Sequence, residues 1–357
     1  MDEYCELFEQ IGETIHPEKD EKNRVVNKIF NYGNFRGELF EAYNDFFLTA
    51  QTLAKTTRNM GYLRSDVIFY FSTYDKIDAF GGIQRSSGQA YVIISHALFE
   101  AMHSFCNEIS EPLNDFSRKN GLVIDQITKV RAKQFLFSIA STYLYFHELG
   151  HVIQAEGDVD LDVSNSDNTS NNHVNPYDER SHMRELDADQ FATRMICLYM
   201  LNYFDNGLDD ELRTPHRMAE LTAFTLLGIS VLFHVLSNNL TRPFHLTKGS
   251  HPHHSIRIKN SLEIFNDIFK KNLIEVDEDR LLDLYARVYV RVFKSASSFV
   301  NHLFQPEPIM IVNDLGETVA APISPQVRAK EIEDYLVLLF ERTLTDPNSL
   351  LVRRIPS

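Results

Sequence analysis

Five consecutive residues, HELGH at positions 147–151, combine side chains from which proteins build metal centres. In an α-helix, residues four positions apart share a face and lie about 5–6 Å from each other, so His147 and His151 would direct two imidazoles at one point. Neutral imidazole is a good zinc ligand. Glu148 lies on the flank of that face, where it reaches a metal-bound water rather than the metal. The pattern predicts hydrolysis by a zinc-activated water whose proton the glutamate accepts.

The residues around this motif decide against a chance occurrence. The alternative is a pair of surface histidines beside a solvated glutamate, and the pentapeptide alone is only moderately specific. The stretch FSIASTYLYFHELGHVI, residues 137–153, is apolar on all sides, which predicts a buried helix. Three buried polar side chains without partners would be costly, and a metal ion would satisfy them.

A catalytic zinc normally has three protein ligands and one open position. RELDADQFA, which begins at residue 184, offers Glu185 as the third ligand, 34 residues after His151. Asp189 follows four residues later on the same helix face, where it can accept the free N–H of a ligand histidine. An ordinary acidic helix face is the competing interpretation. His182 and Asp187 are rival ligands, although Asp187 projects away from the face that Glu185 and Asp189 share.

The elements that must position these residues are mostly helical. Two segments rich in β-branched and aromatic residues, 67–73 and 90–95, predict strands, and Gly81 and Gly82 between them fit a hairpin turn. Helical segments are expected at residues 128–155, from a cap at Asn175 onward, as a pair over 217–240, from about 255, and through most of the last hundred residues.

Composition favours a soluble globular protein of 357 residues, which is enough for one large domain or two ordinary ones. The net charge of −15 excludes binding of nucleic acid through a broad basic face. Three widely separated cysteines suggest neither disulfides nor a CxxC metal site and fit a cytoplasmic location. The start of the chain is acidic, unlike a signal peptide. Its most apolar run, residues 221–236, is shorter than the roughly 20 residues of a membrane span, so we expect a buried helix.

A polar stretch follows the HELGH helix, at residues 157–175. It is rich in Asp, Asn and Ser and predicts a loop. Its alternating acids resemble a calcium loop, but the glycine and the bidentate glutamate of an EF-hand are missing, so a solvated loop is the default. Because the stretch connects the two ligand helices, we hypothesise that it gates access of substrate.

These motifs together resemble the gluzincin metallopeptidases. HELGH followed by ELDAD is similar to the core of M48-type membrane proteases, and SHPHHSIRI, residues 250–258, resembles their Ser/Thr-His-Pro…Arg-Ile motif. The segment IDAFGG before the second strand is also similar, with Asp78 where that family usually has asparagine. The resemblance covers about residues 65–260. Membrane-spanning helices are absent from the sequence, which suits the soluble phage-exclusion Lit-type (U49) peptidases better.

The resemblance implies roles for two further residues. His251 would donate a hydrogen bond to the oxyanion that develops on the scissile carbonyl, and a loop histidine is the alternative. Arg257 would orient Asp189 or Glu185, and a solvated helix arginine is the alternative. His253 and His254 are expected at the surface rather than in a second metal site. Gluzincins also bind extended peptides along a sheet edge, which residues 90–95 would supply. A core strand is the alternative, and the two interpretations are compatible.

We therefore expect a mostly helical α+β fold with a zincin-like core, a small sheet and an HExxH active-site helix. The expected division is a helical extension at 1–64, a catalytic core at 65–264 and a mainly helical C-terminal region at 265–357. The predicted activity is that of a Zn²⁺-dependent endopeptidase acting on a protein or peptide. Two alternatives stay open: a non-catalytic zinc-binding regulator or sensor, and a latent protease that an activating protein partner switches on.

Overall fold

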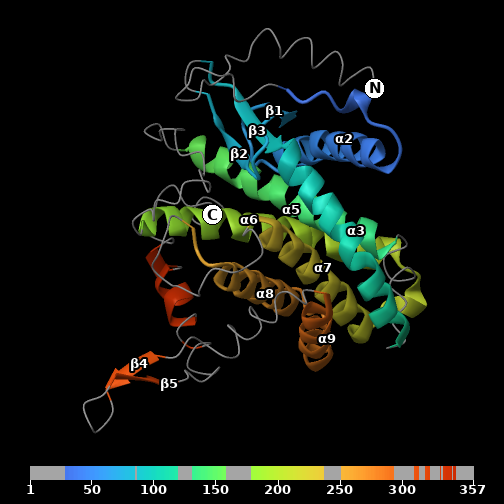
Figure 1. The fold of residues 1–357 in the computed structure, drawn as a ribbon, viewed down its shortest axis with the longest axis vertical. Helices are drawn as coiled ribbons and strands as arrows, with labels where there is room; N and C mark the ends of the chain where they lie inside the picture. The colour runs from blue at the N-terminus through green and yellow to red at the C-terminus, as the bar shows by residue number, and fades with distance from the viewer. Residues whose placement is uncertain are drawn as a thin grey trace.

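A computed structural model describes residues 29–84, 87–119, 131–157, 178–236 and 251–292, together with shorter stretches at 309–312, 318–321, 330, 333–339 and 341–342. Helices make up most of this part of the chain, and a three-stranded sheet lies at one end of it (Figure 1). The α+β, mostly helical prediction is confirmed at this level. The expected cap Asn175, and residues 158–175 of the polar stretch with its gating hypothesis, lie outside the described residues.

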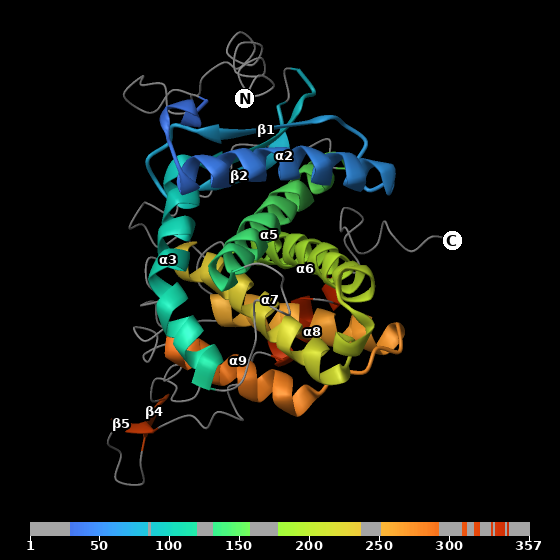
Figure 2. The same cartoon turned by 90° about the vertical axis from the view of Figure 1, so that its right-hand side faces the viewer.

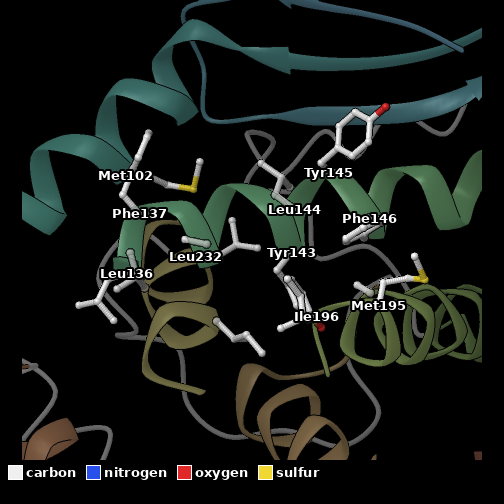
Figure 3. Close-up of a cluster of buried hydrophobic side chains, with 14 of the residues drawn as sticks. Met102, Leu136, Phe137, Tyr143, Leu144, Tyr145, Phe146, Met195, Ile196 and Leu232 are labelled. Carbon is white, nitrogen blue, oxygen red and sulfur yellow. The ribbon is translucent and has the colours of Figure 1, made fainter. Parts of the chain in front are cut away.

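Helix α5 (Ala132–Ala155) carries HELGH and runs through the middle of the molecule. It packs against α3, α6, α7 and strand β2, so all of its sides are covered. Tyr143 and Tyr145 leave α5 on opposite sides, and both are fully buried within the hydrophobic cluster shown in Figure 3. This all-round burial is what the apolar sequence of residues 137–153 predicted.

The sheet consists of β1 (Val67–Ser72), β2 (Ala79–Ile83) and β3 (Ala90–Ser95), in the order β1-β3-β2. β1 pairs with β3 in parallel, and β2 pairs with β3 in antiparallel orientation. Both predicted strands are therefore present. The expectation that residues 90–95 supply a sheet edge is wrong, because β3 is the central strand and β2 is an outer one.

Gly81 and Gly82 lie inside β2 rather than in a hairpin turn, which corrects the sequence-based assignment. At Gly81 the reason for glycine is a close approach between the strand and α5. A Cβ atom built there would lie 1.9 Å from the carbonyl oxygen of Glu148. No other residue fits without moving the strand, so the glycine sets the distance between the sheet and the HELGH helix.

Helix α6 (Glu179–Gly207) packs along α5 and carries the ELDAD motif. Its N-cap is Asp178, whose side chain accepts a hydrogen bond from the backbone N–H of Arg180. Helix α7 (Pro215–Leu236) is a single helix where a pair was expected. It is long and apolar enough to cross a membrane, but 94% of its most apolar window is buried inside the fold, as in the core helix of a soluble protein.

Helices α2 (Glu38–Asn59), α3 (His96–Lys119), α8 (His254–Lys271) and α9 (Glu278–Val292) complete the body. Figure 2 shows α2 lying across the sheet end, with α8 and α9 at the opposite end below α7. One hydrophobic cluster runs from Tyr32 to Val288 and includes residues of α2, α3, α5, α6, α7, α8 and α9. The predicted N-terminal extension and the start of the C-terminal region thus share one core with the central region.

Two C-terminal segments are described. Strands β4 (Ile309–Val312) and β5 (Thr318–Ala321) form an antiparallel hairpin that projects from the body in both views (Figures 1 and 2). Residues 333–339 are helical and return to α6 and α8. There, Tyr335, Leu336 and Leu339 pack on Leu186 and Ile256 in a second hydrophobic cluster.

Candidate functional site

The structure brings His147, His151 and Glu185 together at the contact between α5 and α6. One candidate ligand atom from each residue lies within 4.8 Å of the other two. Nε2 of His147 is 3.2 Å from Nε2 of His151 and 3.4 Å from Oε2 of Glu185. Nε2 of His151 is 3.2 Å from Oε1 of Glu185. Two imidazole nitrogens and one carboxylate thus face a common point.

Small residues at the crossing of α5 and α6 make this convergence possible. A Cβ atom built on Gly150 would lie 3.1 Å from Cα and 3.2 Å from Cβ of Ala188. Gly150 is the fourth residue of HELGH, and Ala188 is the fourth of ELDAD. Their small size lets the two backbones approach until Glu185 reaches the histidines.

Asp189 and Arg257 lie on the Nδ1 side of His147, and a terminal nitrogen of Arg257 also lies 3.6 Å from Oε2 of Glu185. Oδ1 of Asp189 lies 2.9 Å from Nδ1 of His147. Nε and one terminal nitrogen of Arg257, on α8, donate hydrogen bonds of 2.7 Å to the two carboxylate oxygens of Asp189. All three side chains are buried. The geometry holds His147 with Nε2 toward the ligand cluster, the arrangement expected of residues around a metal ligand.

Electrostatics at this cluster favour a positive charge at its centre. Burial alone would lower the pKa of His147, but hydrogen bonds to Asp189 and Glu185 and the negative charges of both carboxylates raise it to about 10. Burial also lowers the pKa of His151, but the charge of Glu185 and its hydrogen bond outweigh this effect, and the pKa is raised. Burial would raise the pKa of Glu185 and Asp189, yet the surrounding His and Arg residues lower it. A divalent cation meets the same electrostatic demand.

Glu148 and His251 lie on the border of the cluster. Glu148 is buried within α5, between the two histidines in sequence, and its carbonyl faces Gly81 of β2. His251 comes from the segment before α8, and its Nε2 lies 3.7 Å from Oε1 of Glu185. The side chains of His151 and His251 are 21% and 25% exposed, so water reaches the cluster from their side.

Gln154 is a site residue that the sequence did not indicate. Its Oε1 lies 2.9 Å from Nδ1 of His151. Its Nε2 donates hydrogen bonds to the carbonyl oxygen of Arg184 and to Oδ2 of Asp187. A glutamine three residues after a ligand histidine matches no common motif. The sequence feature that could have pointed to Gln154 is its polar side chain in an otherwise apolar segment.

The rival ligands have other contacts. His182 is fully buried, and its Nδ1 is 2.7 Å from the hydroxyl of Tyr335. Asp187 contacts Gln154, away from the shared face of Glu185 and Asp189 as predicted. The expectation of a surface position is wrong for His253, which is buried, and His254 is partly covered by the ring of Phe233.

Comparison with known proteins points to the same central region. A family model described as peptidase U49 matches residues 72–275, more than half of the chain. The matched range includes β3, both helices of the His–His–Glu cluster, and Arg257 on α8. No curated protein and no solved structure matches the chain. The match to the family model is extensive enough to assign the protein: the chain belongs to the peptidase U49 family.

Proposed function

We propose that this protein is a zinc-dependent endopeptidase with a zincin-like core of the gluzincin type. One observation carries the proposal: His147, His151 and Glu185, from two different helices, place three ligand atoms within 4.8 Å of one another. Membership of a peptidase family supplies the reaction class. The motif HELGH then assigns hydrolysis to a metal-assisted mechanism rather than to a serine or cysteine nucleophile.

The residues fit zinc in the chemistry of their donor atoms. Two imidazoles and one carboxylate form a common protein ligand set of catalytic zinc, which leaves a position for water or substrate. The hydrogen bond to Asp189 fixes the orientation of His147, as a ligand histidine requires. His182, which would close the site as a fourth ligand, is hydrogen-bonded to Tyr335 instead. This arrangement favours an open catalytic site over the closed site of a regulator.

Zinc held by His147, His151 and Glu185 would lower the pKa of a coordinated water to about 7 and polarise the scissile carbonyl. Glu148 is the base: its carboxylate accepts the proton of the attacking water and delivers it to the nitrogen of the leaving amine. His251 donates a hydrogen bond to the oxygen on which negative charge develops. Asp189 and Arg257 do not touch the substrate and serve as positioning residues for His147.

A protein or peptide substrate would bind in extended form along β2. Among the described residues, this strand pairs with β3 on one side only, and it lies against the backbone of Glu148 at Gly81. Main-chain hydrogen bonds to an edge strand hold an extended peptide with little dependence on its sequence. Its scissile bond would then lie beside the catalytic glutamate.

We further propose that the enzyme acts in the cytoplasm on a specific intracellular protein and stays latent until an activating protein partner binds it. The free, buried thiols of Cys106 and Cys197 are compatible with a reducing compartment. Latency is proposed from the resemblance to the phage-exclusion Lit-type peptidases, which fits a protease that a partner or phage component switches on. A test on generic substrates alone would therefore not measure its activity.

The decisive variant is Glu148→Gln, which removes the base but leaves all three ligands. We expect zinc content to stay at the wild-type level, whereas turnover falls by roughly 10²–10⁴-fold because general-base catalysis is lost. Zinc is measured by mass spectrometry. Turnover is measured by mapping new protein N-termini in cells and lysates that contain each variant.

Glu108→Gln is the matched control, because it makes the same chemical change at an exposed position of α3. It should cleave like the wild type. Wild-type protein that binds no zinc, or a Glu148→Gln variant that generates the same new N-termini, would refute the proposed function.

A further inference from the structure

We propose that Gln154 is a positioning residue that holds His151 in the tautomer with its proton on Nδ1, so that Nε2 presents its lone pair to the metal. The inference rests on the proposed function, since it concerns how a ligand of the zinc site is prepared. Asp189 fulfils this role for His147 and was expected from the sequence; the second histidine has a different partner.

The hydrogen-bond partners of Gln154 determine how its amide is oriented. Nε2 lies 3.0 Å from the carbonyl oxygen of Arg184 and 3.1 Å from Oδ2 of Asp187. A backbone carbonyl oxygen and a carboxylate accept hydrogen bonds, so the group that faces both must be the NH₂ with its two hydrogens. The reversed amide would place an oxygen against two other oxygens.

This orientation leaves Oε1 of Gln154 facing Nδ1 of His151 at 2.9 Å. Because an amide oxygen only accepts, Nδ1 must carry the hydrogen. In the neutral imidazole the other nitrogen then has the lone pair. That nitrogen, Nε2, is the atom that lies 3.2 Å from Oε1 of Glu185 and from Nε2 of His147.

Burial makes the contact of Gln154 with His151 a persistent one. The side chain of Gln154 is 5% exposed and lies between α5 and α6, where water competes little for its hydrogen bonds. Both of its donor contacts are to α6, the helix that carries Glu185. Gln154 therefore ties the orientation of one ligand to the helix that supplies another.

The two histidines are consequently oriented by chemically different partners. His147 contacts a carboxylate that is paired with a buried arginine on α8. His151 contacts an uncharged amide that is held by Asp187 on α6. A neutral partner fixes the tautomer without adding another negative charge next to Glu148 and Glu185.

The first test compares Gln154→Met with wild type. Methionine has similar length and no amide, so His151 loses its acceptor. We expect the dissociation constant for zinc, measured by competition with a chromophoric chelator, to rise about 10–100-fold. Ser141→Ala is the control on the same helix: the Ser141 hydroxyl donates only to carbonyls of its own helix, so zinc affinity should not change.

A second variant distinguishes positioning from mere packing. Gln154→Glu combined with Asp187→Asn exchanges donor and acceptor at this contact while an oxygen still faces His151. We expect this double variant to recover part of the zinc affinity, because one carboxylate oxygen still faces the carbonyl oxygen of Arg184. Gln154→Glu alone sets two carboxylates against each other and should bind zinc more weakly than the double variant. A double variant no better than Gln154→Glu alone would overturn the inference.

The third readout is spectroscopic and needs no substitution. Long-range ¹H–¹⁵N spectra of zinc-loaded wild-type protein, labelled at histidine, should show His151 with a proton on Nδ1 and the metal on Nε2. Metal on Nδ1, or a zinc affinity of Gln154→Met equal to wild type, would overturn the role of Gln154 while leaving the proposed function intact. Absence of zinc binding by the wild type would instead refute the proposed function itself.

Discussion

At the scale of single residues, the candidate site is a set of buried charges that compensate one another. Asp189 and Arg257 are 0% and 4% exposed, and each provides the other's counter-charge. The position of Asp189 beside Glu185 could be inferred from spacing, because residues four apart on a helix share a face. Arg257 was expected only from the resemblance of SHPHHSIRI to a family motif. The role of Gln154 could not be inferred from the sequence, because it depends on which atoms of α6 lie opposite the side chain. No spacing of residues encodes that arrangement.

Asp189→Asn tests the charge pair. It removes the counter-charge of Arg257 and the carboxylate on Nδ1 of His147, and breaking a buried ion pair costs about 3–5 kcal/mol. We expect a loss of unfolding free energy of that order in urea titrations and a zinc affinity reduced about 10–100-fold. Asp115→Asn is the control: its ion pair with Arg118 is exposed and should contribute at most about 1 kcal/mol. Equal effects of the two substitutions would contradict this account.

The buried position of His234 predicts that the stability of the fold depends on pH. Burial lowers the pKa of His234 from its ordinary 6.5 to about 4. Between these values the unfolded chain binds a proton that the folded protein does not, so stability decreases as pH falls through this window. The loss amounts to about 3 kcal/mol, at 1.36 kcal/mol per pKa unit.

The measurement is the unfolding free energy of wild type and His234→Phe at pH 7 and pH 4. Phenylalanine can keep the stacking on Phe105, where the ring centroids are 4.3 Å apart, but it does not titrate. The variant should therefore lose less stability on acidification than the wild type. An identical loss in both proteins would exclude His234 as the cause.

At the scale of elements, hydrophobic patterns predicted which segments form helices and strands. They predicted less well which elements lie next to one another. The all-round apolar character of residues 137–153 correctly predicted burial of α5. The strands at 67–73 and 90–95 were also found, but their order in the sheet was not, because alternation along one strand says nothing of which strands flank it. Gly81 was assigned to a turn because glycine is more often used there than for close backbone contact.

Gly150→Ala tests the crossing of α5 and α6. Alanine is the better helix former by about 0.8–1.0 kcal/mol. The added Cβ would nevertheless lie 3.1 Å from Cα of Ala188, so α6 must shift. We expect weaker zinc binding and a net loss of stability of about 1–3 kcal/mol, as in overpacked cores. Adding Ala188→Gly removes the contact with Cβ of Ala188 at 3.2 Å but not the one with Cα, so it should restore part of the zinc affinity. A double variant no better than the single one would contradict the explanation.

At the scale of the whole molecule, residues far apart in sequence complete the environment of the site. Tyr335 reaches His182 across 153 positions, and Leu186 and Ile256, next to Glu185 and Arg257, belong to the cluster that the C-terminal segment covers. No local pattern predicts such a return of the chain. The family match ends at residue 275, so this contact lies partly outside the matched range.

Tyr335→Phe should loosen this contact locally. The second hydrophobic cluster is separate from the main core, so we expect faster hydrogen exchange in residues 333–339 and at the start of α6, with α5 and α7 unchanged. The lost hydrogen bond contributes about 0.5–1.5 kcal/mol. Val337→Ala, at a half-exposed position of the same segment, is the control. Exchange that rises equally throughout the protein would show that the segment does not open on its own.

The approach of Gly81 to the carbonyl oxygen of Glu148 has a consequence for genetics. A saturation screen scored by activity would rank position 81 with the ligands and the catalytic base, because every replacement displaces the strand that lies on the HELGH helix. Loss of function at that codon would then reflect the close approach of the backbones of β2 and α5, not a catalytic role of residue 81. Such a screen needs a parallel measurement of bound metal before intolerance at a position is interpreted as chemistry.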